Sequence, residues 1–104
     1  MTVRERNLNL PMEQIEAFCR RHPIRKLSLF GSALRDDFTE ESDVDFLVEF
    51  FPGATPGLIK FLGMQYELED LTGRKADLRT PKEFTQQHLA NILKEAEALY
   101  VCEN

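Results

Sequence analysis

The stretch LFGSALRDDFTEESDVDFLVEFF, residues 29–51, joins a Gly-Ser pair, an acidic segment and an apolar run. No basic side chain lies between Arg35 and Lys60, and the chain outside residues 36–49 carries a net charge of +2 against −5 for the whole. Such a concentrated negative patch repels phosphate unless cations intervene, so direct binding of nucleic acid is not expected. The patch is either solvated surface or a metal site. Its seven carboxylates are Asp36, Asp37, Glu40, Glu41, Asp43, Asp45 and Glu49.

The alternation in DVDFLVEFF predicts a half-buried strand. Val44, Phe46, Val48 and Phe50 share one face, and Asp43, Asp45, Leu47 and Glu49 share the other. Side chains two residues apart on a strand leave the same face about 6.5–7 Å apart, so the two aspartates would repel each other unless a cation lies between them. Oxygen ligands with no nearby His or Cys favour Mg²⁺, or Mn²⁺, over zinc. The other acidic residues of the segment are expected to be solvated.

The Gly31-Ser32 pair, which ends an expected strand over residues 24–30, supplies complementary chemistry. Glycine allows a tight turn and the close approach of another group, and serine can cap a short helix after it. Backbone N–H groups and a hydroxyl at such a turn can bind an anion. Beside a carboxylate pair that binds metal, the expected ligand is a metal-bound polyphosphate.

The flanking sequence predicts an α/β fold, with a small mixed sheet, flanking helices and a single domain over residues 1–104. Residues 11–22 form a first helix, and residues 74–80 a third strand with Ala76 and Leu78 toward the core. A helix over residues 56–72 has Thr55 as N-cap, Gly73 as its stop and an apolar stripe. A Thr80-Glu83 capping box opens a last helix that continues to Leu99. The stripe is Leu58, Phe61, Met64, Leu68 and Leu71.

Length and composition indicate the cellular compartment, the state of the cysteines and where the substrate is bound. No apolar run is long enough to span a membrane and residues 1–11 lack the apolar core of a leader, so the sequence predicts a cytoplasmic protein with no membrane contact. Cys19 and Cys102 have no metal-ligand spacing and are expected to be unpaired thiols. A chain of 104 residues has no room for a separate substrate domain, so its substrate is bound largely outside it.

At these residues the sequence resembles the minimal nucleotidyltransferase domain of the DNA polymerase beta superfamily, whose signature is Gly-Ser, ten residues, Asp-x-Asp. FGSALRDDFTEESDVDFLVEF matches it without a gap. The resemblance implies a palm-like fold in which Asp43, Asp45 and a third aspartate hold two Mg²⁺ ions. Gly31 and Ser32 would then bind the phosphates of ATP. Asp77 is the candidate third ligand, and pairing with Arg74 or Arg79 is its alternative role.

The resemblance also implies a partner. Small domains of this family are often the antitoxins of HEPN-domain ribonuclease toxins, which they silence by transferring AMP from ATP to a tyrosine hydroxyl. A hetero-oligomer with such a toxin is therefore expected. Two alternatives stay open: a non-catalytic antitoxin that occludes its partner through the helix over residues 56–72 or the C-terminal helix, and nucleotidyl transfer to a small molecule such as an aminoglycoside.

Overall fold

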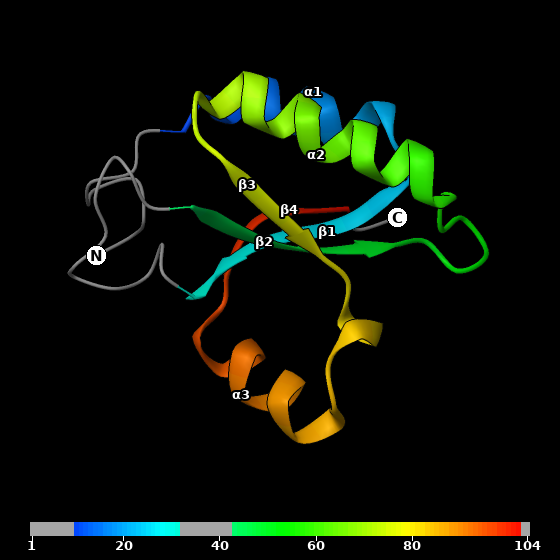
Figure 1. The fold of residues 1–104 in the computed structure, drawn as a ribbon, viewed down its shortest axis with the longest axis vertical. Coiled ribbons are helices and arrows are strands. Elements are labelled where there is room, and N and C mark those ends of the chain that lie inside the picture. Colours follow the sequence, from blue (N-terminus) through cyan, green and yellow to red (C-terminus); the bar gives the residue numbers. More distant parts are fainter. Residues whose placement is uncertain (1–9, 32–42, 103–104) are drawn as a thin grey trace.

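The computed structural model describes residues 10–31 and 43–102, and their centre is a four-stranded mixed sheet in the order β3-β2-β1-β4 (Figure 1). Strand β1 is antiparallel to both of its neighbours, whereas β2 and β3 are parallel. A parallel pair needs a crossover connection, and the helix α2 supplies it. The strands are β1 (Ile24–Phe30), β2 (Val44–Phe50), β3 (Ala76–Arg79) and β4 (Glu97–Val101).

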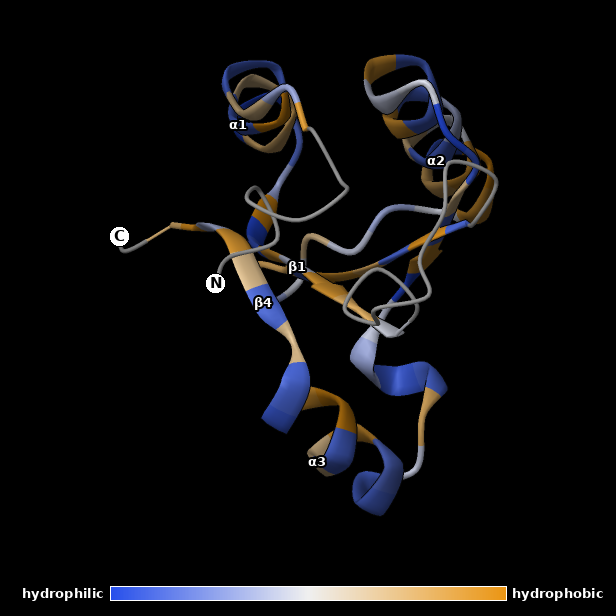
Figure 2. Ribbon diagram, turned by 90° about the vertical axis from the view of Figure 1, so that its left-hand side faces the viewer, coloured by the Kyte–Doolittle hydropathy of each residue, from blue (hydrophilic) through white to orange (hydrophobic). Residues whose placement is uncertain are grey.

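The helices lie on both faces of the sheet and make three layers. Helices α1 (Met12–Arg21) and α2 (Leu58–Thr72) lie side by side on one face. The short 3-10 helix η3 (Pro81–Glu83) and α3 (Gln86–Glu95) lie on the other, where η3 contacts β2 and α3 contacts β1 (Figure 2). No helix in the described part of the chain is long and apolar enough to cross a membrane.

The alternation along β2 separates the core from the site. Val44, Phe46 and Val48 are fully buried and join the core formed with α1 and α2, as predicted. Asp45 is half-buried on the opposite face. Leu47 also lies on that face and is fully buried, so η3 and α3 leave only part of it to solvent. The second face therefore combines packing at its middle with polar side chains near its end.

Most predicted elements are confirmed, but α2 begins later than predicted. Its N-cap is Gly57, whose extended backbone (φ −69°, ψ 170°) delays the helix, and Thr55 does not cap it. Gly73 ends the helix in the left-handed conformation (φ 70°), as predicted. Met64 and Leu68 are buried, but Leu58 is 73% exposed and does not belong to the core stripe.

The predicted C-terminal helix is confirmed over residues 86–95, but it is interrupted after its first turn and ends before Leu99. The Thr80-Glu83 capping box forms, but it closes only the three residues of η3. Thr85 then caps α3 by accepting a hydrogen bond from the backbone N–H of His88, and α3 ends at Ala96, whose backbone is extended. The following residues form β4, because the otherwise free edge of β1 offers unpaired backbone groups and EALYV contains strand-favouring Tyr and Val.

Candidate active site

Three adjacent strands bring three of the predicted site residues to one end of the sheet. Gly31 directly follows β1, Phe30 pairs with Asp45 on β2, and Asp45 pairs with Asp77 on β3. Neighbouring strands lie about 4.8 Å apart, and residues paired in register point to the same face. The structure therefore places the Asp45 and Asp77 carboxylates side by side, although their positions are 32 residues apart in the printed sequence.

Gly31 passes unusually close to Asp45. Its φ of 69° lies in the left-handed region that favours glycine. A Cβ atom added to Gly31 would lie 2.5 Å from Oδ2 of Asp45, closer than any non-bonded contact allows. The backbone conformation therefore favours glycine here, and a larger residue would displace either the turn or the Asp45 carboxylate; the close approach predicted from the sequence is present.

Asp43 lies one residue before β2 and is exposed. The backbone N–H of the next residue, Val44, donates to the carbonyl oxygen of Lys75 over 2.9 Å. This bond ties the start of β2 to the segment that enters β3. The Asp-x-Asp segment is thereby fixed beside the strand that carries Asp77.

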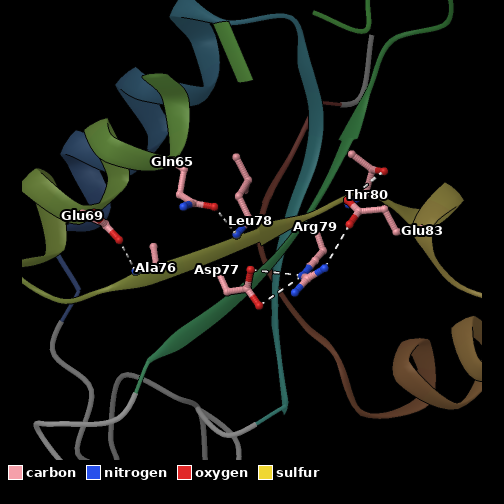
Figure 3. Close-up of polar contacts among 8 residues, drawn as sticks. All are labelled: Gln65, Glu69, Ala76, Asp77, Leu78, Arg79, Thr80 and Glu83. Atoms are coloured by element: carbon pink, nitrogen blue, oxygen red, sulfur yellow. Dashed lines mark hydrogen bonds and ion pairs between the residues drawn. The ribbon is translucent and has the colours of Figure 1, made fainter. Parts of the chain in front are cut away.

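Asp77 takes part in a chain of polar contacts that runs to η3 (Figure 3). Nε of Arg79 lies 3.1 Å from each oxygen of the Asp77 carboxylate, and Nη1 of Arg79 lies 3.2 Å from Oε1 of Glu83. The other oxygen of Glu83 accepts from the backbone N–H of Thr80 over 2.8 Å. Hydrogen bonds to Asp77 and then Glu83 raise the pKa of Arg79. Pairing with Arg79 was the alternative role predicted for Asp77, and the structure contains it.

Side chains from α2 hold the outer edge of β3. Oε2 of Glu69 accepts from the backbone N–H of Ala76 over 3.0 Å, and Oε1 of Gln65 accepts from that of Leu78 over 3.2 Å (Figure 3). These bonds occupy the two N–H groups on either side of Asp77 and so fix its strand. Neither residue is predicted from the sequence, because both contacts depend on how α2 packs beside β3 and not on a pattern within the helix.

The family model for nucleotidyltransferase domains matches residues 11–99. The chain belongs to this family. A protein of Methanocaldococcus jannaschii named "Putative protein adenylyltransferase" is 33% identical over 90 residues, which cover 86% of this chain and 95% of that protein. The resemblance inferred from the Gly-Ser and Asp-x-Asp spacing is confirmed, and so is the expectation that the chain is an enzyme.

Solved structures agree with this assignment. The structure titled "putative minimal nucleotidyltransferase" is 30% identical, with a TM-score of 0.68, and the match covers 82% of this chain and 85% of that one. A complex of a tri-AMPylated Shewanella oneidensis HEPN toxin with an MNT antitoxin matches at a TM-score of 0.64 and 16% identity, covering 88% and 71%. The second likeness shows the fold alone. The predicted nucleotidyltransferase fold is confirmed.

The donor set of this nucleotidyltransferase fits a hard divalent cation. Asp43, Asp45 and Asp77 offer carboxylate oxygens alone, the ligands that Mg²⁺ prefers. Within residues 10–31 and 43–102, no three His, Cys, Asp or Glu side chains already form a metal-ligand group. Nε of Arg79 lies 3.1 Å from both oxygens of Asp77, so part of the acceptor capacity of this carboxylate is already used.

Two hollows adjoin the aligned residues of the nucleotidyltransferase. One, of about 280 Å³, begins at Phe30 and Gly31 and is walled by Phe84, His88 and other residues of α3. A wider groove, of about 480 Å³, extends from Asp77 and Arg79 to Leu58, Phe61 and Leu62 of α2. The first adjoins the predicted phosphate site, and the second joins Asp77 to an exposed apolar helix face.

Other residues considered from the sequence are placed elsewhere or are not described. Ser32 and the acidic residues 36–41 lie outside the described residues. Glu49 lies four residues along β2 from Asp45 and pairs with Arg25, with 3.6 Å between Nη2 and Oε1. Nε2 of His22 lies 3.1 Å from Oε1 of Glu67, and the His88 ring packs edge-on against Phe84.

Proposed function

We propose that this nucleotidyltransferase transfers AMP from ATP, with Mg²⁺, to a tyrosine hydroxyl of a partner HEPN-domain toxin and thereby acts as its antitoxin. The observation that carries the proposal is the alignment of Gly31, Asp45 and Asp77 across three adjacent strands. The protein adenylyltransferase name of the Methanocaldococcus relative supports AMP as the group and protein as the acceptor. The HEPN toxin of the Shewanella complex supports the partner.

The aligned residues divide the chemistry between them. Gly31 and Ser32 hold the terminal phosphates, and the hollow beside Phe84 and His88 leaves room for the nucleoside. Asp43, Asp45 and Asp77 would hold two Mg²⁺ ions, for which Mn²⁺ could substitute. When bound, the ions would supply positive charge that offsets the charge developing on the leaving pyrophosphate. Asp77 would complete the metal site nearest the attacking hydroxyl and help to remove its proton.

The exposed face of α2 supports an acceptor on another protein. Leu58 is 73% exposed and Ile59 is 88% exposed, and Leu62 and Tyr66 continue the same face. Gathered apolar side chains of this kind typically mark an interaction surface. The groove between Leu58 and Asp77 would bring a segment of a docked partner to the site. A hetero-oligomer in which the toxin covers the α2 face would place its acceptor in this groove. We place this complex in the cytoplasm, a reducing compartment that suits the unpaired Cys19 and Cys102.

The same exposed face favours a second candidate function, a non-catalytic antitoxin that occludes its partner. Both functions use the α2 face, but only the first changes the partner covalently. Intact-mass analysis of a HEPN-domain partner, co-expressed with and without this protein, separates them. We expect the partner to gain the mass of one or more AMP groups on tyrosine. A partner that is bound and inactive at unchanged mass would favour occlusion.

The proposal predicts that ATP binding depends on metal. The triphosphate and the aspartates carry like charges, so without a cation between them their repulsion should weaken binding at least about tenfold. Calorimetric titration of ATP in Mg²⁺ and then in EDTA measures the difference. Adenosine, which has no phosphate, is the control and should bind equally in both. Equal affinity for ATP in both buffers would exclude a site built on bound cations.

A further inference from the structure

Arg79 holds both oxygens of the Asp77 carboxylate, and this contact bears on the metal affinity of the site. Nε of Arg79 is 3.1 Å from Oδ1 and from Oδ2. The single Nε–H donates to Oδ2 and lies equally close to Oδ1, so the guanidinium charge already occupies part of the capacity of this carboxylate for a cation. The predicted metal ligand nearest the acceptor is thus engaged by a side chain two residues away on the same strand.

Glu83 binds the same guanidinium through a different nitrogen, Nη1. Oε1 of Glu83 accepts from Nη1 of Arg79 over 3.2 Å, while Oε2 is held by the backbone N–H and hydroxyl of Thr80 over 2.8 and 3.3 Å. The capping box therefore fixes Glu83 at the start of η3. Arg79 is shared between a ligand candidate on β3 and an anchored carboxylate on η3 (Figure 3).

We propose that Arg79 is a positioning residue that competes with the metal for Asp77, and that Glu83 sets how readily Arg79 releases it. This inference rests on the proposed function, because it takes Asp77 as a metal ligand. When a cation binds, Asp77 turns an oxygen from Arg79 toward it, and Arg79 keeps its contact with Glu83. The positive guanidinium also repels a divalent cation held at Asp77. Arg79 and Glu83 therefore tune metal affinity in opposite directions.

The test is the affinity of the full chain for Mn²⁺ alone, measured by calorimetry without nucleotide or partner. Arg79→Met removes the competing charge and should lower the Kd for Mn²⁺ about fivefold to tenfold. Glu83→Gln keeps the capping box, since Gln serves there as well as Glu, but weakens the pull on Arg79. It should raise the Kd about threefold. Arg79→Lys keeps the charge, but one ammonium cannot contact Asp77 and Glu83 as the guanidinium does, so its Kd should lie between those of the unaltered protein and Arg79→Met.

Arg25→Met is the matched control. Arg25 also belongs to an exposed ion pair, with Glu49, and its side chain is 53% exposed against 46% for Arg79. Glu49 lies four residues along β2 from Asp45, about 13 Å away at the usual rise of a strand. Removing this charge should leave the Kd for Mn²⁺ unchanged. An equal fall of the Kd for Mn²⁺ in Arg25→Met and Arg79→Met would mean that net charge alone causes the effect, and it would overturn the proposal.

A double-mutant cycle with Asp77→Asn shows whether Arg79 acts through Asp77. In that background, Arg79→Met should lose most of its effect on the Kd for Mn²⁺. An undiminished effect, or a Kd that Arg79→Met raises or leaves unchanged in the unaltered chain, would overturn the proposal. Circular dichroism of each variant checks that it is folded. The Mn²⁺ titration involves neither ATP nor toxin, so it tests this inference alone. The proposed function is tested separately, and it fails if the unaltered protein adds no AMP to its partner.

Discussion

The double substitution Asp43→Asn and Asp45→Asn is expected to abolish AMP transfer while the protein stays folded. Asn preserves the volume of each side chain but removes the negative charge that binds a cation. Metal ions contribute several kcal/mol to stabilising charge in transfer reactions of this class, and each 1.4 kcal/mol is tenfold in rate. We therefore expect transfer to fall at least about 10³-fold. Asp43 is exposed and Asp45 half-buried, so the free energy of unfolding should change by about 1 kcal/mol or less.

Single-turnover transfer of labelled AMP to the partner, alongside thermal unfolding, measures both effects. Glu13→Gln with Glu16→Gln is the matched control, because it also removes two charges, one exposed and one half-buried, from α1 on the far face of the sheet. The control should transfer AMP normally. The aspartate variant should still bind its partner through α2 but no longer neutralise it in cells. Full neutralisation by the aspartate variant would mean that occlusion, not transfer, silences the toxin.

The parts of the fold that the sequence predicts are those with a local signal. The alternation of Val44, Phe46 and Val48 with Asp45 predicts a strand with one buried face, and the burial of the three apolar residues confirms this prediction. Gly73 ends α2 because its left-handed backbone is a property of one residue. The spacing of Gly31 and Asp45 predicts that the two lie at one site, because the family signature includes both positions, and the structure places them in close approach.

The parts that the sequence did not predict depend on pairing between distant segments. Residues 97–101 continue an apolar pattern that fits a helix, and only the free edge of β1 makes them a strand. Gln65 and Glu69 bond to β3 from another element, so no local pattern reveals their role. The position of Asp77 beside Asp45 likewise requires the parallel pairing of β2 with β3. The sequence predicts pairing with Arg79 as one role of Asp77, whereas the contact between Arg79 and Glu83 depends on the placement of η3 after β3.

Gly31→Ala is expected to impair transfer more than any other single change outside the carboxylates. The added Cβ would lie 2.5 Å from Oδ2 of Asp45, so either the turn after β1 or the carboxylate must move. A displacement of about 1 Å at a reacting centre can cost about 10²-fold in rate, and we expect a loss of that size. The left-handed backbone, at φ 69°, adds strain of about 1–2 kcal/mol for a residue with a Cβ.

Gly73→Ala is the control that separates the two effects of Gly31→Ala, the backbone strain and the clash with Asp45. Gly73 has nearly the same backbone angle, φ 70°, but a Cβ there would meet nothing within 4 Å. It should therefore lose a similar free energy of unfolding, about 1–2 kcal/mol, and still transfer AMP at the normal rate. Thermal unfolding and single-turnover transfer of both variants make the comparison. If both lost transfer equally, the loss would come from general destabilisation. If only Gly31→Ala lost it, the close approach of the turn to Asp45 would itself be required for the reaction.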